Sequence, residues 1–282
     1  MKNNNVILLL SNNLGKLTVN RYNQLVKNRP VNSDIYIILD STREMGTSTN
    51  LPLFRFTFSE LKELNICLFQ DQSLVPGNTH LPIFLFFSKN RFYKKYWLIE
   101  DDVCFTGNWR DFFSDILTNQ FDFGTCHIRK YDQEPNWNYW KIKKDGKALR
   151  KKDMIRSFNT IYCFSNIGIQ QIINSLQNNK WHGHHEVLLP TICKILNLKL
   201  FDFGGDGSYT PEKLKNKYYI SESKIDGSLG NSSFGTMRYR PRITFTFKRN
   251  TLYHPVKELS LIIRILKFFK AKIYLFITRK IL

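Results

Sequence analysis

Three adjacent carboxylates, Glu100, Asp101 and Asp102, follow directly on the apolar run 96–99. The run predicts a buried strand, and in open α/β sheets ligands bind beyond the carboxyl ends of the strands. Adjacent carboxylates repel one another unless a cation neutralises them. Mg²⁺ or Mn²⁺ is the expected cation, because hard ions prefer oxygen ligands and share them with phosphates. A solvated acidic turn or a helix N-cap is the alternative interpretation.

This stretch resembles the D-x-D motif of GT-A glycosyltransferases, with Glu100 and Asp102 at its two acidic positions. The continuation Phe105-x-Gly107-x-Trp109 is similar to bacterial surface-polysaccharide transferases of the lipopolysaccharide or capsule type. The resemblance implies an α/β fold of the GT-A (Rossmann-like) kind, a mostly parallel sheet flanked by helices. It also implies Mn²⁺ or Mg²⁺ bound by Glu100 and Asp102 on the diphosphate of a nucleotide-sugar, expected to be a UDP-sugar, with Asp101 at the donor site.

A second polar cluster, His182, His184, His185 and Glu186, opens the expected helix 186–196. Zinc would suit three histidines, but the spacing is not H-E-x-x-H and no cysteine lies adjacent. Alternatively, one or two of the histidines cap the helix. In inverting GT-A enzymes an acidic residue begins this helix and takes the proton from the acceptor hydroxyl. The resemblance therefore implies that Glu186 is the general base, although His185 stands where those families often have a second acidic residue.

Three further candidates are Asp40, His254 and Lys257. His254 and Lys257 belong to a His-Pro-x-Lys element, in which His can complete an octahedral metal site and Lys can neutralise a diphosphate leaving group. The element resembles the C-terminal His and Lys of several GT-A families, which implies a metal ligand and a phosphate contact. Asp40 ends the expected strand 35–39, where a carboxylate can accept hydrogen bonds from a ribose or a base. Turn residues without a ligand are the alternative in both places.

The elements that must position these residues alternate between short apolar runs and helical stretches, which favours a mostly parallel sheet flanked by helices. The expected strands are 6–10, 35–39, 96–99, 121–128, 157–164, 198–203 and 243–247, and the expected helices are 18–27, 109–118, 167–176 and 186–196. The stretch 129–153 is charged and rich in Trp and Tyr, which predicts a substrate-facing loop, and 204–236 predicts a further loop. Trp181 could stack on a sugar or belong to the core.

The composition limits the class of protein. A chain of 282 residues with 42% hydrophobic residues can bury one sizeable domain. The net charge of +19 attracts polyanions, whether nucleic acid, anionic lipid or a diphosphate-bearing substrate. The five scattered cysteines are interpreted as buried, reduced thiols of a cytosolic protein. No run of about 20 uncharged apolar residues predicts a transmembrane helix.

The leading hypothesis is a metal-dependent glycosyltransferase of surface polysaccharide synthesis. It would transfer sugar from a nucleotide-sugar to a glycan or lipid-linked acceptor, on the inner face of the cell membrane. A metal-dependent hydrolase or nuclease that uses residues 100–102 and the histidines is the first alternative. A nucleic-acid-binding protein is the second. It rests on charge alone, because no helix-turn-helix, zinc finger or RNP motif is present, so no specific nucleic-acid partner is expected.

We expect two units, a GT-A domain at 1–258 and a basic amphipathic tail at 259–282. Large apolar residues alternate in the tail with six basic ones, Arg264, Lys267, Lys270, Lys272, Arg279 and Lys280. Such a segment can lie as a helix in the interface plane of an anionic membrane without spanning it. A C-terminal helix packed on the domain is the alternative.

A chain that ends at Lys257 is therefore expected to lose vesicle binding but keep transfer to a short, soluble acceptor. Each basic residue near an anionic leaflet contributes about 1 kcal/mol, and salt weakens this term. Co-sedimentation with anionic vesicles measures the effect: the full chain should pellet and be released by high salt. If the shortened chain unfolds and the full chain ignores vesicles, the tail is a structural helix.

Overall fold

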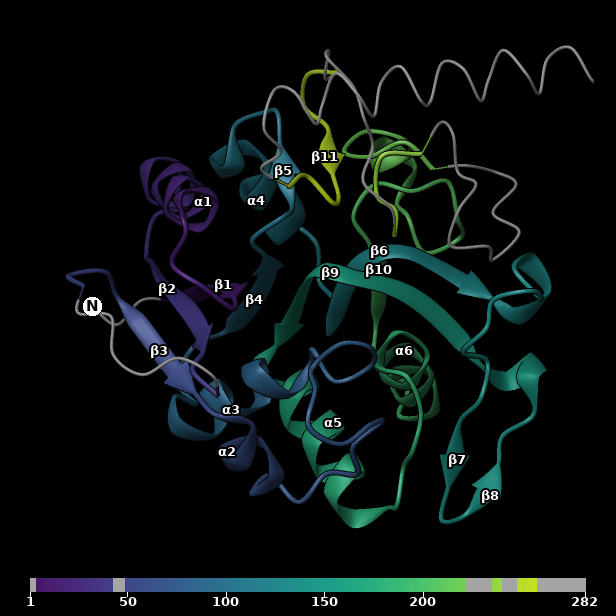
Figure 1. Ribbon diagram of the computed structural model, residues 1–282. Coiled ribbons are helices and arrows are strands. Elements are labelled where there is room, and N and C mark those ends of the chain that lie inside the picture. Colours follow the sequence, from purple (N-terminus) through teal and green to yellow (C-terminus); the bar gives the residue numbers. More distant parts are fainter. Residues whose placement is uncertain (1–3, 43–48, 222–234, 240–247, 258–282) are drawn as a thin grey trace, which may run out of the picture.

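The computed structural model describes residues 4–42, 49–221, 235–239 and 248–257 (Figure 1). A seven-stranded sheet in the order β10-β6-β9-β4-β1-β2-β3 forms its centre. Its strands are β1 (Asn5–Ser11), β2 (Ser33–Asp40), β3 (Leu53–Phe56), β4 (Lys95–Glu100), β6 (Phe123–Lys130), β9 (Ile155–Ser165) and β10 (Leu200–Asp202). All neighbours pair in parallel except β9, which is antiparallel to both β4 and β6. The expected class is confirmed: an α/β fold whose mostly parallel sheet is flanked by helices.

The central strands are continuous apolar runs because both faces of the sheet are covered. Successive side chains of a strand point to opposite faces. In β1, Val6, Leu8 and Leu10 pack into one core cluster, whereas Ile7 and Leu9 pack into the other. The two clusters are the two layers between sheet and helices.

Helices cover each face of the sheet. On one face lie α1 (Lys16–Lys27) and α4 (Trp109–Leu117), and on the other lie α2 (Phe58–Lys62), α3 (Leu81–Lys89), α5 (Asn166–Asn178) and α6 (His185–Ile195) (Figure 1). None of the helices in the described parts of the chain has the length and apolar character that crossing a bilayer requires.

Two small sheets and three short 3-10 helices complete the described part of the chain. β5 (Cys104–Phe105) pairs antiparallel with β11 (Leu252–Tyr253), and β7 (Lys143–Lys144) forms a hairpin with β8 (Lys147–Ala148). The 3-10 helices are η1 (Tyr131–Gln133), η2 (Lys151–Asp153) and η3 (Glu212–Leu214). The pairing of β5 with β11 joins positions far apart in the sequence, immediately beyond the carboxylates at the end of β4.

Parts of the sequence interpretation need correction. The stretch 129–153, predicted to be a substrate-facing loop, is not all loop, because it holds η1, the hairpin and η2, and Trp137 and Trp140 are only 3% exposed. Burying a large aromatic side chain in the core is more favourable than leaving it in contact with solvent. Cys67 is exposed and Cys104 half-buried, so only three of the five thiols are buried. Several predictions fall outside the described residues. They concern the strand 243–247, the part 222–234 of the loop 204–236, the domain boundary at residue 258 and the tail 259–282.

A buried asparagine organises the loop between α2 and α3. The Asn78 side chain accepts a hydrogen bond from the Phe69 backbone N–H and donates to the carbonyls of Gln70 and Ser73, each at 2.8 Å. Asn78 is fully buried. Its amide therefore replaces the backbone pairing that this irregular segment lacks.

Asn78→Asp is expected to lower the free energy of unfolding by at least about 3 kcal/mol, because a carboxylate would face two carbonyl oxygens in a buried site. Urea unfolding measures the loss. Asn174→Asp, at an exposed position of α5, is the matched control and should stay within about 0.5 kcal/mol of the wild type. Equal stability of both variants would contradict the role of the Asn78 amide.

Candidate active site

The carboxyl ends of β1, β2 and β4 meet at one edge of the sheet, because these three strands are parallel neighbours. A cavity of about 740 Å³ lies at this edge. It is lined by all seven residues that the sequence predicts for the site: Asp40, Glu100, Asp101, Asp102, Glu186, His254 and Lys257. The fold thus brings together side chains from four distant parts of the chain.

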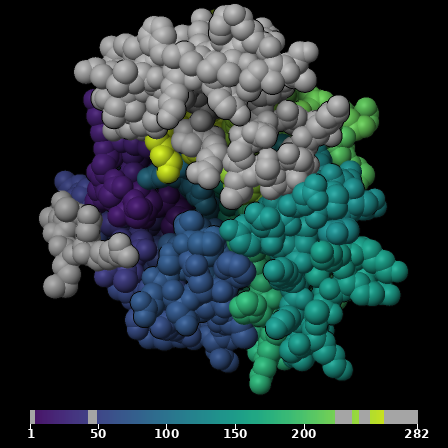
Figure 2. Space-filling view, turned by 45° about the vertical axis from the view of Figure 1, so that its right-hand side comes forward, coloured from purple at the N-terminus to yellow at the C-terminus, as the bar shows by residue number. Residues whose placement is uncertain are grey.

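Segments that line the cavity meet on one face of the molecule. Figure 2 shows the purple N-terminal part, a blue segment, a teal segment and the yellow segment near the C-terminal end of the described chain gathered together. Each of them contributes residues to the cavity wall. The cavity therefore has a wall at the ends of β1 and β2 and another built by β9 and α6.

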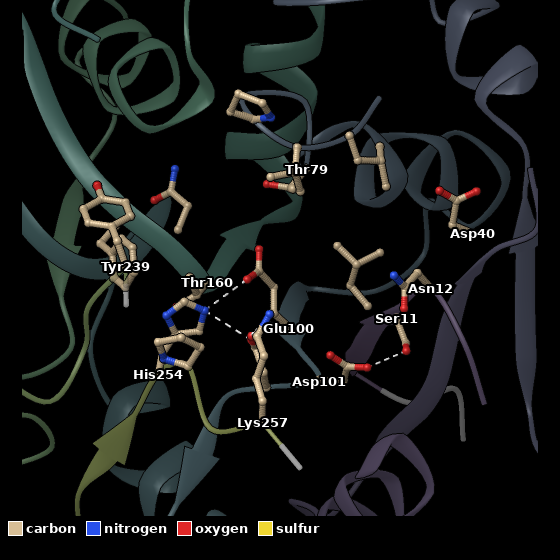
Figure 3. A pocket seen from close by; sticks show the side chains of 18 of the residues that line it. Ser11, Asn12, Asp40, Thr79, Glu100, Asp101, Thr160, Tyr239, His254 and Lys257 are labelled. Carbon is tan, nitrogen blue, oxygen red and sulfur yellow. Dashed lines mark hydrogen bonds and ion pairs between the residues drawn. The ribbon is translucent and has the colours of Figure 1, made fainter. Parts of the chain in front are cut away.

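Glu100, Asp102 and His254 form a compact cluster, and Figure 3 shows Glu100 and His254 facing each other within it. The chain turns after β4, with the Val103 N–H donating to the Glu100 carbonyl, and this turn places Asp102 beside Glu100. The β5–β11 pairing delivers His254, and the Val256 N–H donates to the Asp102 carbonyl at 2.8 Å. The His254 Nε2 lies 3.4 Å from Glu100 Oε2 and 3.2 Å from Asp102 Oδ1.

The cluster fits a divalent cation. One ligand atom from each of Glu100, Asp102 and His254 lies within 4.8 Å of the others, and within the described residues this is the one group of its kind. Asp102 Oδ1 is buried, and the polar atom nearest to it in the cluster is His254 Nε2 at 3.2 Å. The Arg238 carbonyl accepts a hydrogen bond from His254 Nδ1 at 2.6 Å, which directs Nε2 at the carboxylates. His182, His184 and His185 are not part of this group.

The electrostatics of the cluster are those of a strongly coupled acidic site. Burial raises the pKa of Glu100. Burial also opposes ionisation of Asp102, but the hydrogen bond and charge of His254, together with Lys257, outweigh it and hold the Asp102 pKa below its usual value. Burial alone would lower the His254 pKa, whereas Asp102 and Glu100 raise it to about 10. A positive charge at this position is therefore stabilised by the two carboxylates.

Three of the predicted ligand-binding residues lie around the cluster. Lys257 Nζ is 3.6 Å from Asp102 Oδ2, and its side chain is 60% exposed. Asp101 turns away toward the first strand, where its Oδ2 accepts hydrogen bonds from Ser11 at 2.5 Å and Thr18 at 2.8 Å. Asp101 therefore holds the β1–α1 connection in place. Asp40 lies further along the same edge (Figure 3).

Glu186 lies in the first turn of α6, on the opposite wall from the β1–α1 connection. His184 is the N-cap of this helix and accepts a hydrogen bond from the Glu186 N–H, so the capping alternative holds for that histidine. Glu186 is 3% exposed, and burial raises its pKa to about 7 against the opposing effects of Arg156 and Tyr239. Burial lowers the His184 pKa to about 3, which leaves this imidazole neutral near pH 7.

The sequence interpretation missed several lining residues. Tyr239, Tyr139, Thr160 and the loop residues 74–77 all line the cavity. No local pattern marks them, since Tyr239 meets Glu186 across 53 sequence positions. Trp181, by contrast, is 1% exposed and belongs to the core, so it is not a sugar platform.

No protein-family model and no curated protein matches the chain. Solved structures resemble it weakly. An active-site mutant of LgtC is 9% identical over 70% of this chain and 72% of its own, with a TM-score of 0.39. The WbbM bifunctional glycosyltransferase is 10% identical over 68% of this chain and 37% of its own, with a TM-score of 0.36. Mouse xyloside xylosyltransferase 1 is 7% identical over 69% of this chain and 82% of its own, with a TM-score of 0.32. At these values the likeness carries no argument about activity.

Asp102→Asn is expected to weaken Mn²⁺ binding by at least about 100-fold, because it removes a ligand charge from a buried cluster while keeping the shape. Isothermal titration calorimetry with MnCl₂ measures the loss. Asp115→Asn, which changes a carboxylate paired with Lys217 and Tyr218 outside the cavity, is the control. Equal Mn²⁺ affinity of wild type and Asp102→Asn would reject the cation site.

Proposed function

We propose that the protein is a metal-dependent glycosyltransferase that uses a nucleotide-sugar donor. One observation carries the proposal. A single cavity combines a three-ligand cluster for a hard cation and a flanking lysine with a buried carboxylate whose pKa is raised to about 7. A diphosphate leaving group needs the first two, and an acceptor hydroxyl needs the third.

The donor is proposed to lie along the edge formed by β1, β2 and β4. Glu100, Asp102 and His254 would hold Mn²⁺ or Mg²⁺, which when bound would stabilise the negative charge of the diphosphate. Lys257 would contact the same phosphates, since its side chain is exposed and its Nζ lies 3.6 Å from Asp102 Oδ2. Asp40 and the chain after β1, which line the cavity, would face the nucleoside of the donor, expected to be a UDP-sugar.

Glu186 is proposed to act as the general base. Its carboxylate takes the proton of the acceptor hydroxyl while that oxygen bonds to the anomeric carbon of the donor sugar. The bond from the anomeric carbon to the diphosphate oxygen breaks, and the nucleoside diphosphate leaves with the electron pair. A single displacement of this kind inverts the anomeric configuration. The acceptor is proposed to be a glycan or lipid-linked glycan of surface polysaccharide synthesis, reached at the inner face of the membrane.

Glu186→Gln is expected to lower transfer by about 10²- to 10⁴-fold. The thermal shift produced by UDP with Mn²⁺ should stay near the wild-type value, because Glu186 is not among the cation ligands. In the wild type, activity should be present above pH 7 and fall as the pH drops through about 7, where the base becomes protonated. Release of nucleoside diphosphate from a panel of nucleotide-sugars, with product analysis by NMR, measures these effects.

The exposed Glu63→Gln is the matched control and should transfer at the wild-type rate. A product that retains the donor configuration would exclude Glu186 as the base of a single displacement. The same assay separates the alternative functions. A metal-dependent hydrolase or nuclease would cleave its substrate without a nucleotide-sugar, and a nucleic-acid-binding protein would show no nucleotide-dependent thermal shift.

A further inference from the structure

The short segment 236–239 contacts both functional groups of the cavity. The His254 N–H donates to the Thr236 carbonyl at 3.0 Å, and the Arg238 N–H donates to the His254 carbonyl at 3.1 Å. The Arg238 carbonyl also accepts from the imidazole of His254. One residue further along, the Tyr239 hydroxyl lies 2.8 Å from Glu186 Oε2. The segment therefore joins the cation cluster to the carboxylate on the opposite wall.

The direction of the Tyr239 hydrogen bond is forced by its other partners. Arg156 Nη2 lies 2.6 Å and Trp137 Nε1 3.2 Å from the Tyr239 oxygen. Guanidinium and indole N–H groups can only donate. The phenol oxygen therefore accepts from both, and its single proton must point to Glu186 Oε2.

The donors themselves are held in place. Arg156 Nη1 pairs with Glu134 Oε2 at 2.5 Å, and both side chains are at most 3% exposed. The guanidinium also lies over the Trp137 ring, 4.4 Å from its centroid. Moving the two side chains apart would leave each charge unpaired in the protein interior, which is energetically costly. The ion pair therefore holds the guanidinium in place. The Tyr239 oxygen is thus fixed by the protein interior and not by solvent.

We propose that Tyr239 is a positioning residue. Its hydroxyl holds Glu186 by Oε2 so that Oε1 receives the proton of the acceptor. The segment 236–239 also fixes this carboxylate relative to His254 of the cation cluster. The proposal rests on the proposed function for the identity of the acceptor. The orientation of the Glu186 carboxylate itself is independent of it. Tyr239 takes no proton in the step, because its hydroxyl keeps donating to Oε2 while Oε1 changes from carboxylate oxygen to acid hydroxyl.

Several other groups face the Glu186 carboxylate and set its ionisation together with Tyr239. They are Arg156 on β9, His184 at the start of α6, Glu100 at the end of β4 and the backbone N–H of Asn159. A Tyr239→Phe change removes one hydrogen bond to the charged form and leaves the rest in place. The carboxylate of Glu186 should then be less stable relative to its neutral form, so the pKa of Glu186 should rise.

The first test requires no turnover. In the full chain labelled with ¹³C-glutamate, the carboxyl signal of Glu186 is assigned by its loss in Glu186→Gln, and its titration is followed by NMR. In Tyr239→Phe the titration midpoint should rise by about one pH unit, which corresponds to the loss of one charge-assisted hydrogen bond. The matched control is Tyr93→Phe, whose hydroxyl donates to Asp34 at 2.6 Å near the opposite end of β2. Its midpoint should equal that of the wild type.

The second test uses transfer. Tyr239→Phe should lower kcat by roughly ten- to a hundredfold and move the acid limb of the pH profile upward, with KM for the nucleotide-sugar unchanged. An unchanged midpoint together with wild-type kcat would overturn the positioning role. If the wild type transfers no sugar from any donor, the proposed function fails, and the NMR midpoint alone still decides on Tyr239.

Trp137→Phe covers the case in which Tyr239→Phe does not fold. It keeps the tyrosine and removes one of the two donors to its oxygen, which makes the phenol a weaker donor to Glu186. The midpoint should shift in the same direction by a smaller amount. A midpoint equal to that of the wild type in this variant, when Tyr239→Phe does not fold, would overturn the proposal.

Discussion

The repulsion between Glu100 and Asp102 is the constraint around which the cavity is built. Both carboxylates stand at the end of a buried strand, where water cannot screen them as it does at the surface. The imidazole of His254 offsets this repulsion. The pairing of β11 with β5 places it against both carboxylates. The same pairing closes the chain over the sheet edge, so the charge pattern of the site and the closure of the domain depend on one another.

The charge environment of Glu186, on the opposite wall of the cavity, differs from that of the cation cluster. Among the described residues no lysine or arginine forms a direct ion pair with the buried Glu186, and its nearest support is a neutral phenol backed by Arg156. Arg156 is in turn paired with Glu134, which takes up much of its charge. Burial outweighs the stabilising effects of Arg156 and Tyr239 and raises the Glu186 pKa to about 7. Burial thus raises the pKa of Glu186, whereas His254 and Lys257 hold the pKa of Asp102 below its usual value, so two carboxyl groups of one cavity differ in acidity.

Much of the fold follows from local patterns in the sequence. The apolar runs before residues 11, 40 and 100 became β1, β2 and β4 with ends displaced by a residue or two, because strands buried on both faces leave a continuous apolar signal. The sequence patterns do not predict the elements of the segment 53–89, which are β3, α2 and α3. Its helix α3 is apolar on all sides and so lacks the periodicity that marks an amphipathic helix. The burial of Trp137 and Trp140 was also missed, since composition does not tell which aromatic residues the core will take.

The features of the site likewise divide into those that follow from adjacent residues and those that depend on the tertiary structure. The sequence by itself determined that three carboxylates end a buried strand and that a glutamate opens a helix, since both depend on residues adjacent in the chain. It also suggested, through the resemblance, which distant residues belong with them. Only the tertiary structure decided that His254 meets Glu100 and Asp102, that Asp101 turns instead to Ser11 and Thr18, and that Tyr239 supports Glu186. These contacts span 53 to 154 sequence positions, with the longest between residues 100 and 254. The Asp101 contacts follow from the parallel pairing of β1 with β4, and the His254 contacts from the pairing of β11 with β5. No periodicity along the chain records such long-range pairings.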